Sequence, residues 1–558
     1  MACHPVKKRV EMRMVPKPAV TLVLILLAGL ALRLHGIDYG LPHLYDFDEP
    51  NVVHKATVML ATRDFNPHWF GHPGTTAIYL VSVLYGVVYV AGLVVGAFAN
   101  TGDFRALYYT DPTLFYLSGR ILFAVIGTST ILLLYAIARR MFNAKTGLVA
   151  AFFLAVSPLH VYYSKLIRSD ILMTFLVLVA FWFSLQILAR RTWSGYVLAG
   201  FFAGLSIATK YPAAIVLLVI VAAYVFSRAW KDISKLIVSG FACLFGVFTG
   251  SPFLFLDFRT VMSNLVTENR SMHLSATGEG WFRNLIWYVQ EPLGHAFSIS
   301  GLLLAAIGVV LCLVTRKKEK WLLLVFPVGF LFFMASLHLR WERWMLPLLP
   351  FVGVLAALAF WEIVARIGRY TPAWTACLAG LVLLLSFAVP LLKADRIRGC
   401  EMSGKDTRTI AREWILEHLP KGSRILLETY GPELPPVRYT LFVVNDKGSL
   451  VEINPAEIAH TVYRPFYAPI GRLKNVQAIH DQGVEYMVLS HFYDRFLAEK
   501  DRSPDYAKEA STYEALMNRS TKVYEIHRVY AKNSGPSLRI YRFHNAERLF
   551  HPPKPKPG

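Results

Sequence analysis

The chain has 558 residues, of which 55% are hydrophobic, 14% aromatic and only 17% charged, and its mean hydropathy is +0.43. A soluble protein of this length would carry about a quarter charged residues, so the composition excludes an ordinary soluble domain and indicates an integral membrane protein. The formal net charge of +21 lies largely in short clusters beside apolar segments, where membrane topology favours Lys and Arg. We therefore expect a lipid bilayer and no nucleic acid as a partner.

The apolar segments predict a polytopic helical membrane protein. A span needs roughly 20 apolar residues, and the first one follows a basic N-terminus without a small-residue cleavage site, which favours an uncleaved helix over a signal peptide. Counting short and unresolved segments, we expect roughly 11–13 transmembrane helices. The candidate spans lie near 20–35, 117–138, 147–163, 171–188, 195–208, 212–227, 236–256, 296–314, 321–338, 345–365 and 373–391.

Basic clusters give these spans a direction. In the predicted order of spans, all the basic clusters fall on one side of the membrane, which should be the cytoplasm. They lie at 7–9, 138–140, 189–191, 227–232, 316–320 and 366–369. The loops 36–116 and 257–295 then face outward. The apolar segment 76–98 would invert every later cluster if it crossed alone. It is therefore interpreted as a re-entrant or interfacial hairpin, or as one of an unresolved pair of crossings.

The composition changes to that of a soluble domain after Lys393. TRTIAREWILEHL places apolar residues on one helical face, and RILLE at 424–428 reads as a strand. Another helix and strand follow in NVQAIHDQGVEYMVLS, and KVYEIHRVYA and SLRIYRF predict further strands. The predicted organisation is a membrane domain over 1–392, an outward α/β domain over 393–550 and a disordered Pro-rich tail over 551–558.

The most informative polar site follows the first span, in LYDFDEPNVVHKATVML. Pro50 suits the first turn of a helix, which places Asp48 and Glu49 at its N-terminus. Helix capping is the common reason for such acidic residues. The functional alternative is a general base at the membrane surface, because a helix N-terminus favours the ionised carboxylate that a base needs.

The same loop raises the question of a metal. His35, His43 and His54, with Asp46, Asp48 or Glu49, could bind a divalent metal ion, but their spacing matches no standard ligand pattern. The five cysteines form no CxxC spacing either. We assign no metal ligands and leave a divalent-metal requirement open.

Cations gather at the predicted outer ends of the spans. A single cation there usually reaches toward lipid head groups. As a set, however, these cations lie on the face where the positive-inside rule disfavours them, beside an acidic loop, so we expect an anionic ligand such as a lipid phosphate. They are Arg120, Lys165, Arg168 with Asp170, Lys210, Arg340 and Arg343.

An ordered series of motifs runs along the chain: DFDEPN, NPHWFGHPG, SGRILFAVIGTSTILLLYAIARR, GLVAAFFLAVSPLHVYYSKLIRSDILMTF, GLSIATKYPAAIVLL and RWERWMLPLLPFVGVLAA. This series resembles the GT-C superfamily of glycosyltransferases, specifically the bacterial relatives of protein O-mannosyltransferases and of the lipid A aminoarabinose transferase. The resemblance covers nearly the whole chain. It implies a donor in which a sugar is linked to polyprenyl phosphate.

The resemblance also implies site residues. It makes Asp48 the catalytic residue with Glu49 beside it, and His72–Pro73 resembles the HPP-type motif, with Gly74 in place of the second Pro. We predict that the donor phosphate is held by Arg120, Arg168, Lys210, Arg340 and Arg343, and that His72 and Asp170 serve the acceptor or the loop.

The chemistry predicted from these residues is a displacement at the anomeric carbon. Asp48 would take a proton from the acceptor hydroxyl, and the lipid phosphate would leave as an anion stabilised by Arg and Lys, with inversion. This predicts a hexosyl- or pentosyltransferase at the periplasmic face of a bacterial inner membrane, acting on a lipid, glycan or protein acceptor. The alternatives are a transporter or flippase of a lipid-linked anionic substrate, whose charges more often lie near the bilayer midplane, and a non-catalytic subunit.

Overall fold

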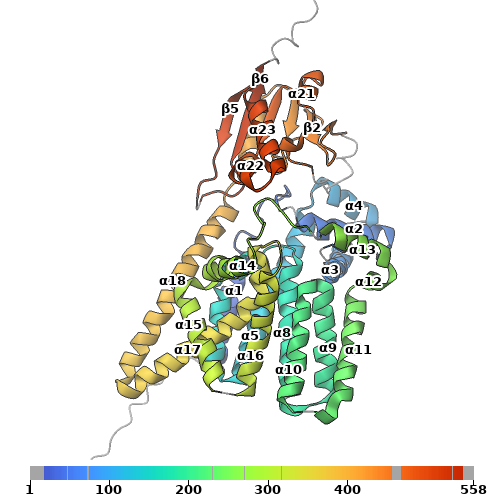
Figure 1. The fold of residues 1–558 in the computed structure, drawn as a ribbon. Coiled ribbons are helices and arrows are strands. Elements are labelled where there is room, and N and C mark those ends of the chain that lie inside the picture. The colour runs from blue at the N-terminus through green and yellow to red at the C-terminus, as the bar shows by residue number, and fades with distance from the viewer. Residues whose placement is uncertain are drawn as a thin grey trace, which may run out of the picture.

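The computed structural model describes residues 18–46, 48–71, 74–228, 230–268, 270–315, 317–454, 467–530 and 532–544. It shows a helical bundle with a smaller sheet-containing unit above one end (Figure 1). The expectation of a polytopic helical membrane protein with a C-terminal α/β unit is confirmed. The predicted disordered tail at 551–558 lies outside the described residues.

Within the described ranges, seven helical segments are long and apolar enough to cross a membrane. An eighth span results if α6 (Ala144–Ala155) and α7 (Pro158–Ser164), which bend by 64°, cross as one. The chain is thus a multi-pass membrane protein. The seven segments are α3 (Thr75–Val94), α5 (Thr113–Met141), α8 (Ser169–Arg190), η2 (Trp230–Asp232) with α11 (Ile233–Gly250), α14 (Trp281–Tyr288) with η3 (Val289–Leu293) and α15 (Gly294–Val314), η4 (Glu342–Leu348) with α17 (Leu349–Tyr370), and α18 (Ala373–Ser403) as far as Asp395.

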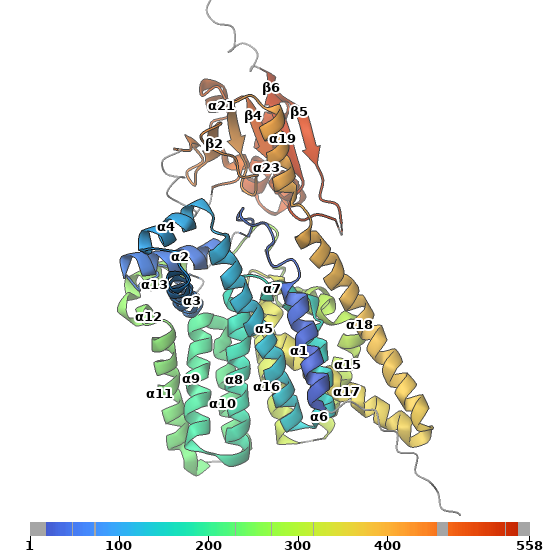
Figure 2. The same cartoon turned by 180° about the vertical axis from the view of Figure 1, so that it is seen from behind.

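Other apolar helices stand beside these spans in the bundle (Figures 1 and 2). They are α1 (Pro18–Leu34), α9 (Trp193–Thr209), η1 (Tyr211–Ile215) continued by α10 (Val216–Phe226), and α16 (Lys318–Ala335). Every span expected from the sequence coincides with one of these helices or with the bent pair. The turns that carry the described basic clusters lie at the end of the bundle away from the C-terminal unit (Figure 1).

The segment 76–98 forms α3, whose direction differs from that of the bundle. Both views show α3 nearly end-on and α8 to α11 from the side, so α3 runs across them (Figures 1 and 2). It belongs to a layer at the end of the bundle nearest the C-terminal unit, with α2 (Glu49–Thr62), α4 (Thr101–Thr110), α12 (Phe253–Leu256) and α13 (Phe258–Glu268). Although α3 is long enough to span, this direction favours the interpretation as an interfacial helix.

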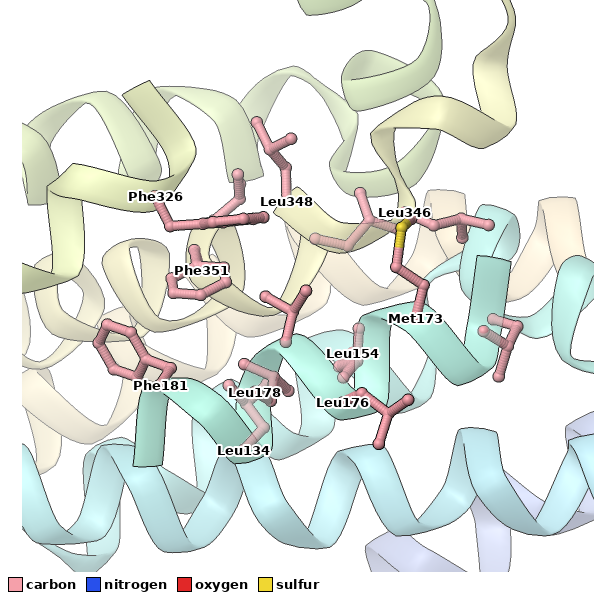
Figure 3. Close-up of a cluster of buried hydrophobic side chains, with 14 of the residues drawn as sticks. Leu134, Leu154, Met173, Leu176, Leu178, Phe181, Phe326, Leu346, Leu348 and Phe351 are labelled. Carbon is pink, nitrogen blue, oxygen red and sulfur yellow. The ribbon is translucent and has the colours of Figure 1, made fainter. Parts of the chain in front are cut away.

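The core of the bundle is one apolar cluster in which widely separated helices meet. Figure 3 shows side chains of α5, α6, α8, α16 and the η4–α17 segment converging. The ring of Phe351 lies 5.1 Å from that of Phe181 and 5.0 Å from that of Phe326, between centroids. This packing holds the start of α8 and η4, which carry candidate site residues, at fixed positions.

Small residues allow α9 and α11 to approach closely. A Cβ atom on Gly200 would lie 2.1 Å from the Ser239 carbonyl oxygen, and one on Gly204 would lie 2.0 Å from that of Cys243. Only glycine fits at these contacts. Such small-residue contacts are typical of helix pairs in membranes, where close van der Waals packing drives association.

The C-terminal unit contains a six-stranded sheet in the order β3-β2-β1-β4-β6-β5, with β2, β1 and β4 parallel and the others antiparallel. The expected helix at 407–419 is α19 (Thr407–His418), and the expected strand at 424–428 is β1 (Arg424–Leu427). The other strands are β2 (Thr440–Val444), β3 (Leu450–Glu452), β4 (Tyr486–Leu489), β5 (Ser520–Ile526) and β6 (Leu538–Phe543). The other helices in the described part of the unit are η5 (Ile470–Arg472), α21 (Gln477–Asp481), α22 (Phe492–Ala498), η6 (Lys500–Arg502) and α23 (Pro504–Met517). The expected boundary at 392/393 falls inside α18, which continues to Ser403.

Candidate active site

The acidic loop after α1 is organised by Asp46. Its Oδ1 atom accepts the backbone N–H groups of Asp48 at 3.0 Å and Glu49 at 3.1 Å. The start of α2 is therefore capped by Asp46 and not by the Asp48 side chain. Since capping does not occupy Asp48, its carboxylate is directed to other partners, and 46% of its side-chain area is exposed.

Arg168, directly before α8, joins the two aspartates. Its Nη2 atom donates to Asp46 Oδ2 at 2.8 Å, and its Nη1 atom donates to Asp48 Oδ2. Burial alone would lower the pKa of the Arg168 guanidinium, but the carboxylates of Asp46 and Asp48 outweigh that effect and hold the pKa well above its usual range. Arg168 is therefore a permanent cation that fixes Asp48.

A cavity of about 70 Å³ opens beside Asp48. It brings together four of the residues expected at the donor phosphate or the acceptor: Arg168, Asp170, Lys210 and Arg343. Arg343 Nη1 lies 3.8 Å from Asp48 Oδ2. Lys210 Nζ, at the end of α9, donates to Asp170 Oδ1 at 2.5 Å. Three cations and two carboxylates thus line one small space, and Asp46 balances the third cation through its pair with Arg168. Arg343, which has the longest ion-pair distance of the set, is the cation best placed to contact an added anion.

Glu49 and Arg120 pair with each other and do not line the cavity, where the sequence predicted them. Both side chains are only 1% exposed, and they form a bidentate pair with distances of 2.9 and 2.6 Å. Arg120 Nη1 also donates to the carbonyls of Ile37 at 2.9 Å and Tyr39 at 2.7 Å, and Glu49 Oε1 accepts the Ile167 N–H at 3.0 Å. The structure thus places both side chains in a fully bonded, buried pair that braces the site, and not in the lining of the cavity.

Arg340 is also directed away from the cavity. It donates to Glu279 at 2.8 Å, and Arg502 of the C-terminal unit lies 3.7 Å from the same carboxylate. The structure thus places Arg340 in a cluster with Glu279 and Arg502, outside the lining of the cavity. Lys165 donates to the His35 carbonyl at 2.6 Å. His72 lies outside the described residues.

A divalent metal ion would need a group of ligand side chains close together. In the described part of the chain no group of three or more His, Cys, Asp and Glu side chains is arranged to hold a metal ion. One of the loop histidines has another partner there. His43 Nδ1 lies 2.7 Å from Glu433 Oε2.

The C-terminal unit contacts the acidic loop through α19 and the residue before it. Arg408 of α19 donates to the Tyr45 carbonyl at 3.0 Å, and its guanidinium lies 3.9 Å from the centre of the Tyr45 ring. The Tyr45 hydroxyl lies 2.7 Å from Thr409 Oγ1, and Tyr39 donates to Asp406 at 3.2 Å. The loop that carries Asp48 is thus held between the bundle and the C-terminal unit.

Sequence reasoning missed several residues of this site. Asn51, Trp69 and Trp344 line the cavity, and Asp46 orients both Asp48 and Arg168. Asp46 carried a usable signal, since an Asp two residues before a predicted helix start can accept its first N–H groups. The two tryptophans carried none, because their meeting depends on how the helices pack.

Comparison with known proteins supports this fold. Residues 116–255 match the family model described as dolichyl-phosphate-mannose-protein mannosyltransferase. This segment runs from α5 to α12 and includes Arg120, Arg168, Asp170 and Lys210. None of the curated proteins matches the sequence significantly.

Solved structures give the rest of the comparison. ArnT from Cupriavidus metallidurans in the apo state is 13% identical with a TM-score of 0.54, over 94% of this chain and 98% of that chain. ArnT bound to undecaprenyl phosphate is 13% identical with a TM-score of 0.53, over 93% and 97%. The Archaeoglobus fulgidus oligosaccharyltransferase tethered to an acceptor peptide is 12% identical with a TM-score of 0.52, over 90% and 72%. The resemblance expected from the motifs is confirmed: the chain has the fold of the GT-C superfamily of glycosyltransferases.

Proposed function

We propose that this protein transfers a single sugar, a hexose or pentose, from polyprenyl phosphate to an acceptor hydroxyl at the periplasmic face of a bacterial inner membrane. The observation that carries the proposal is the half-exposed Asp48 carboxylate at the mouth of a cavity lined by Arg168, Lys210 and Arg343. A base and three cations are what such a transfer needs. ArnT, which shares the fold, has been solved bound to undecaprenyl phosphate, which supports a lipid phosphate as the anion.

In the proposed reaction the acceptor oxygen attacks the anomeric carbon as Asp48 takes the hydroxyl proton. The new C–O bond forms while the bond from the anomeric carbon to the phosphate oxygen breaks, and polyprenyl phosphate leaves with that electron pair. Arg343 and Lys210 stabilise the charge that develops on the phosphate, since cations held in place before the reaction need little reorganisation. Attack opposite the leaving group inverts the anomeric configuration.

Arg168 gives Asp48 its geometry in this proposal. A base must lie within hydrogen-bond reach of the proton it accepts, and Asp48 shares Arg168 with Asp46, which also holds the start of α2. The buried Glu49–Arg120 pair fixes the same turn from below. Four charged side chains thus position one exposed carboxylate oxygen.

A transporter or flippase would move its substrate without breaking a bond, so the test is bond cleavage in detergent, where no transport can occur. Purified protein receives a panel of undecaprenyl-phosphate hexoses and pentoses, radiolabelled in the sugar, together with a membrane extract as acceptor source. We expect release of undecaprenyl phosphate and transfer of the label with one donor. Intact donors throughout would contradict the proposal.

A further inference from the structure

A second cavity, of about 330 Å³, lies behind the candidate active site. It opens where α7, the outer end of α18, η4 and the β5–β6 connection of the C-terminal unit meet. Its lining residues are Tyr39, Tyr162, Tyr163, Glu342, Arg398, Glu401, Met402, Arg528, Ser534 and Gly535. The proposed function gives this space no role.

This second cavity shares walls with the active-site cavity. Tyr163 lines it, and the Tyr163 ring centre lies 5.7 Å from the guanidinium carbon of Arg168, which holds Asp48. Glu342 also lines it, whereas the next residue, Arg343, lines the active-site cavity. A ligand in the second cavity would therefore adjoin the Asp48 base.

The lining offers unsatisfied polar groups beside flat rings. Within the described residues, the Arg398 guanidinium has no hydrogen bond or ion pair and stacks 5.5 Å above the centre of the Tyr162 ring. The rings of Tyr162 and Tyr163 lie 5.0 Å apart at 87°, and their hydroxyls likewise have no hydrogen-bond partner in the described ranges. In the same lining, Arg528 donates to Glu401 at 2.8 Å.

This chemistry fits a saccharide better than an acyl chain or a metal. Tyrosine rings present apolar faces to the C–H face of a sugar ring, while their hydroxyls, a guanidinium and carboxylates bond its hydroxyls. An acyl chain would need an aliphatic lining, and Met402 is the sole aliphatic side chain among the described lining residues. The C-terminal unit contributes Arg528, so the cavity faces the aqueous side and not the lipid from which a donor comes.

We propose that this second cavity is a carbohydrate subsite that holds the acceptor, so that the acceptor is a glycan or the sugar headgroup of a glycolipid. The assignment of the bound saccharide as the acceptor rests on the proposed function, but binding of a saccharide to this cavity does not depend on turnover. The acceptor hydroxyl would project past Tyr163 toward Asp48, and the donor phosphate would occupy the smaller cavity.

The first test is saturation-transfer difference NMR with methyl α-mannoside, methyl β-glucoside, methyl α-galactoside and methyl α-rhamnoside. We expect saturation transfer to at least one glycoside with the wild type, and its loss in Tyr162→Phe and Arg398→Ala. The matched controls are Tyr370→Phe and Arg366→Ala, since both side chains are exposed near the end of α17 that lies away from the C-terminal unit (Figure 1), and they should keep the signal. No transfer from the wild type, or equal transfer from all variants, would overturn the subsite.

The second test follows the radiolabelled sugar into its product. Label in an organic-phase species that chromatography separates from the donor identifies a glycolipid acceptor, and label in the aqueous polysaccharide identifies a glycan. Either supports the subsite, and Arg398→Ala should then raise the acceptor KM about tenfold, the effect of one interaction worth about 1.4 kcal/mol. Label in protease-sensitive material would overturn it while leaving the transferase intact. Glycoside binding without release of polyprenyl phosphate would instead reject the proposed function.

Discussion

The buried Glu49–Arg120 pair should be among the most sensitive elements of the fold. Glu49→Leu leaves the Arg120 guanidinium buried with two carbonyl acceptors, and Arg120→Met leaves the carboxylate with one backbone N–H. Removing one partner of a buried ion pair costs about 3–5 kcal/mol, because the other charge stays buried without compensation. We expect each single variant to lose that much of the free energy of unfolding.

The double variant Glu49→Leu with Arg120→Met separates the cost of an uncompensated buried charge from the cost of the lost backbone hydrogen bonds. With both charges gone, the remaining cost is that of the orphaned N–H of Ile167 and carbonyls of Ile37 and Tyr39, each about 1–3 kcal/mol at most. We therefore expect the double variant to lose roughly 2–3 kcal/mol less than the sum of the single losses, as contacting residues are not additive.

The measurement is unfolding by sodium dodecyl sulfate in mixed micelles, followed by circular dichroism. A matched control is the exposed i,i+4 pair of Glu362 and Arg366 in α17, at 3.1 Å, where 62% of the arginine side chain is exposed. Glu362→Leu and Arg366→Met should each cost at most about 0.5 kcal/mol. The brace assigned to Glu49 and Arg120 is refuted if their single variants unfold no more easily than these controls.

Three further outcomes follow from the site and the C-terminal unit. Arg343→Ala should raise the donor KM about tenfold or more, whereas Arg340→Ala, which breaks the Glu279 ion pair and the contact with the Trp287 ring, should not, and equal donor KM values would reject that division. Asp46→Asn should lower kcat about tenfold by freeing Arg168 to bind Asp48 alone, and an unchanged kcat would show that Asp46 only caps α2. Burial raises the pKa of Glu428 to about 8, so the native state holds its proton above pH 4.5 and stability is lost as pH rises from about 4.5 to 8. Glu428→Gln should flatten that decline in thermal melts, and a melt profile parallel to that of the wild type would contradict it.

The membrane-embedded part of the fold was predictable because its signals are local. Apolar runs fixed the spans, and basic clusters placed the turns correctly at one end of the bundle. The segment 76–98 was the difficult case, since its length and hydropathy satisfy the test for a span. Only the parity of the basic clusters argued against a crossing, and the direction of α3 agrees with that argument.

The candidate site was predictable in its residue types and only partly in its arrangement. Arg168, Lys210 and Arg343 meet beside Asp48, as charge placement suggested. Arg120 and Arg340 carry the same charge at similar span ends, yet one pairs with Glu49 and the other with Glu279. The sequence could not separate these cases, because each depends on which carboxylate the packing brings within reach.

The C-terminal unit showed the same limit. The helix at 407–419 and the strand at 424–428 were evident from periodicity, whereas the role of Arg408 was not. Its contact with Tyr45 joins residues separated by more than 360 positions, and no local sequence pattern predicts such a contact. The second cavity, built from α7, α18 and the β5–β6 connection, was hidden for the same reason.

The central claim, that Asp48 is the base of a sugar transfer from polyprenyl phosphate, is tested most directly by release of undecaprenyl phosphate from the radiolabelled donor. Wild type is compared with Asp48→Asn, and with Asp111→Asn as a control at an exposed helix start, each checked by size-exclusion chromatography. We predict turnover by the wild type and the control, and a loss of about 10²–10⁴-fold in Asp48→Asn. Equal turnover in all three would remove Asp48 from the mechanism and contradict the account.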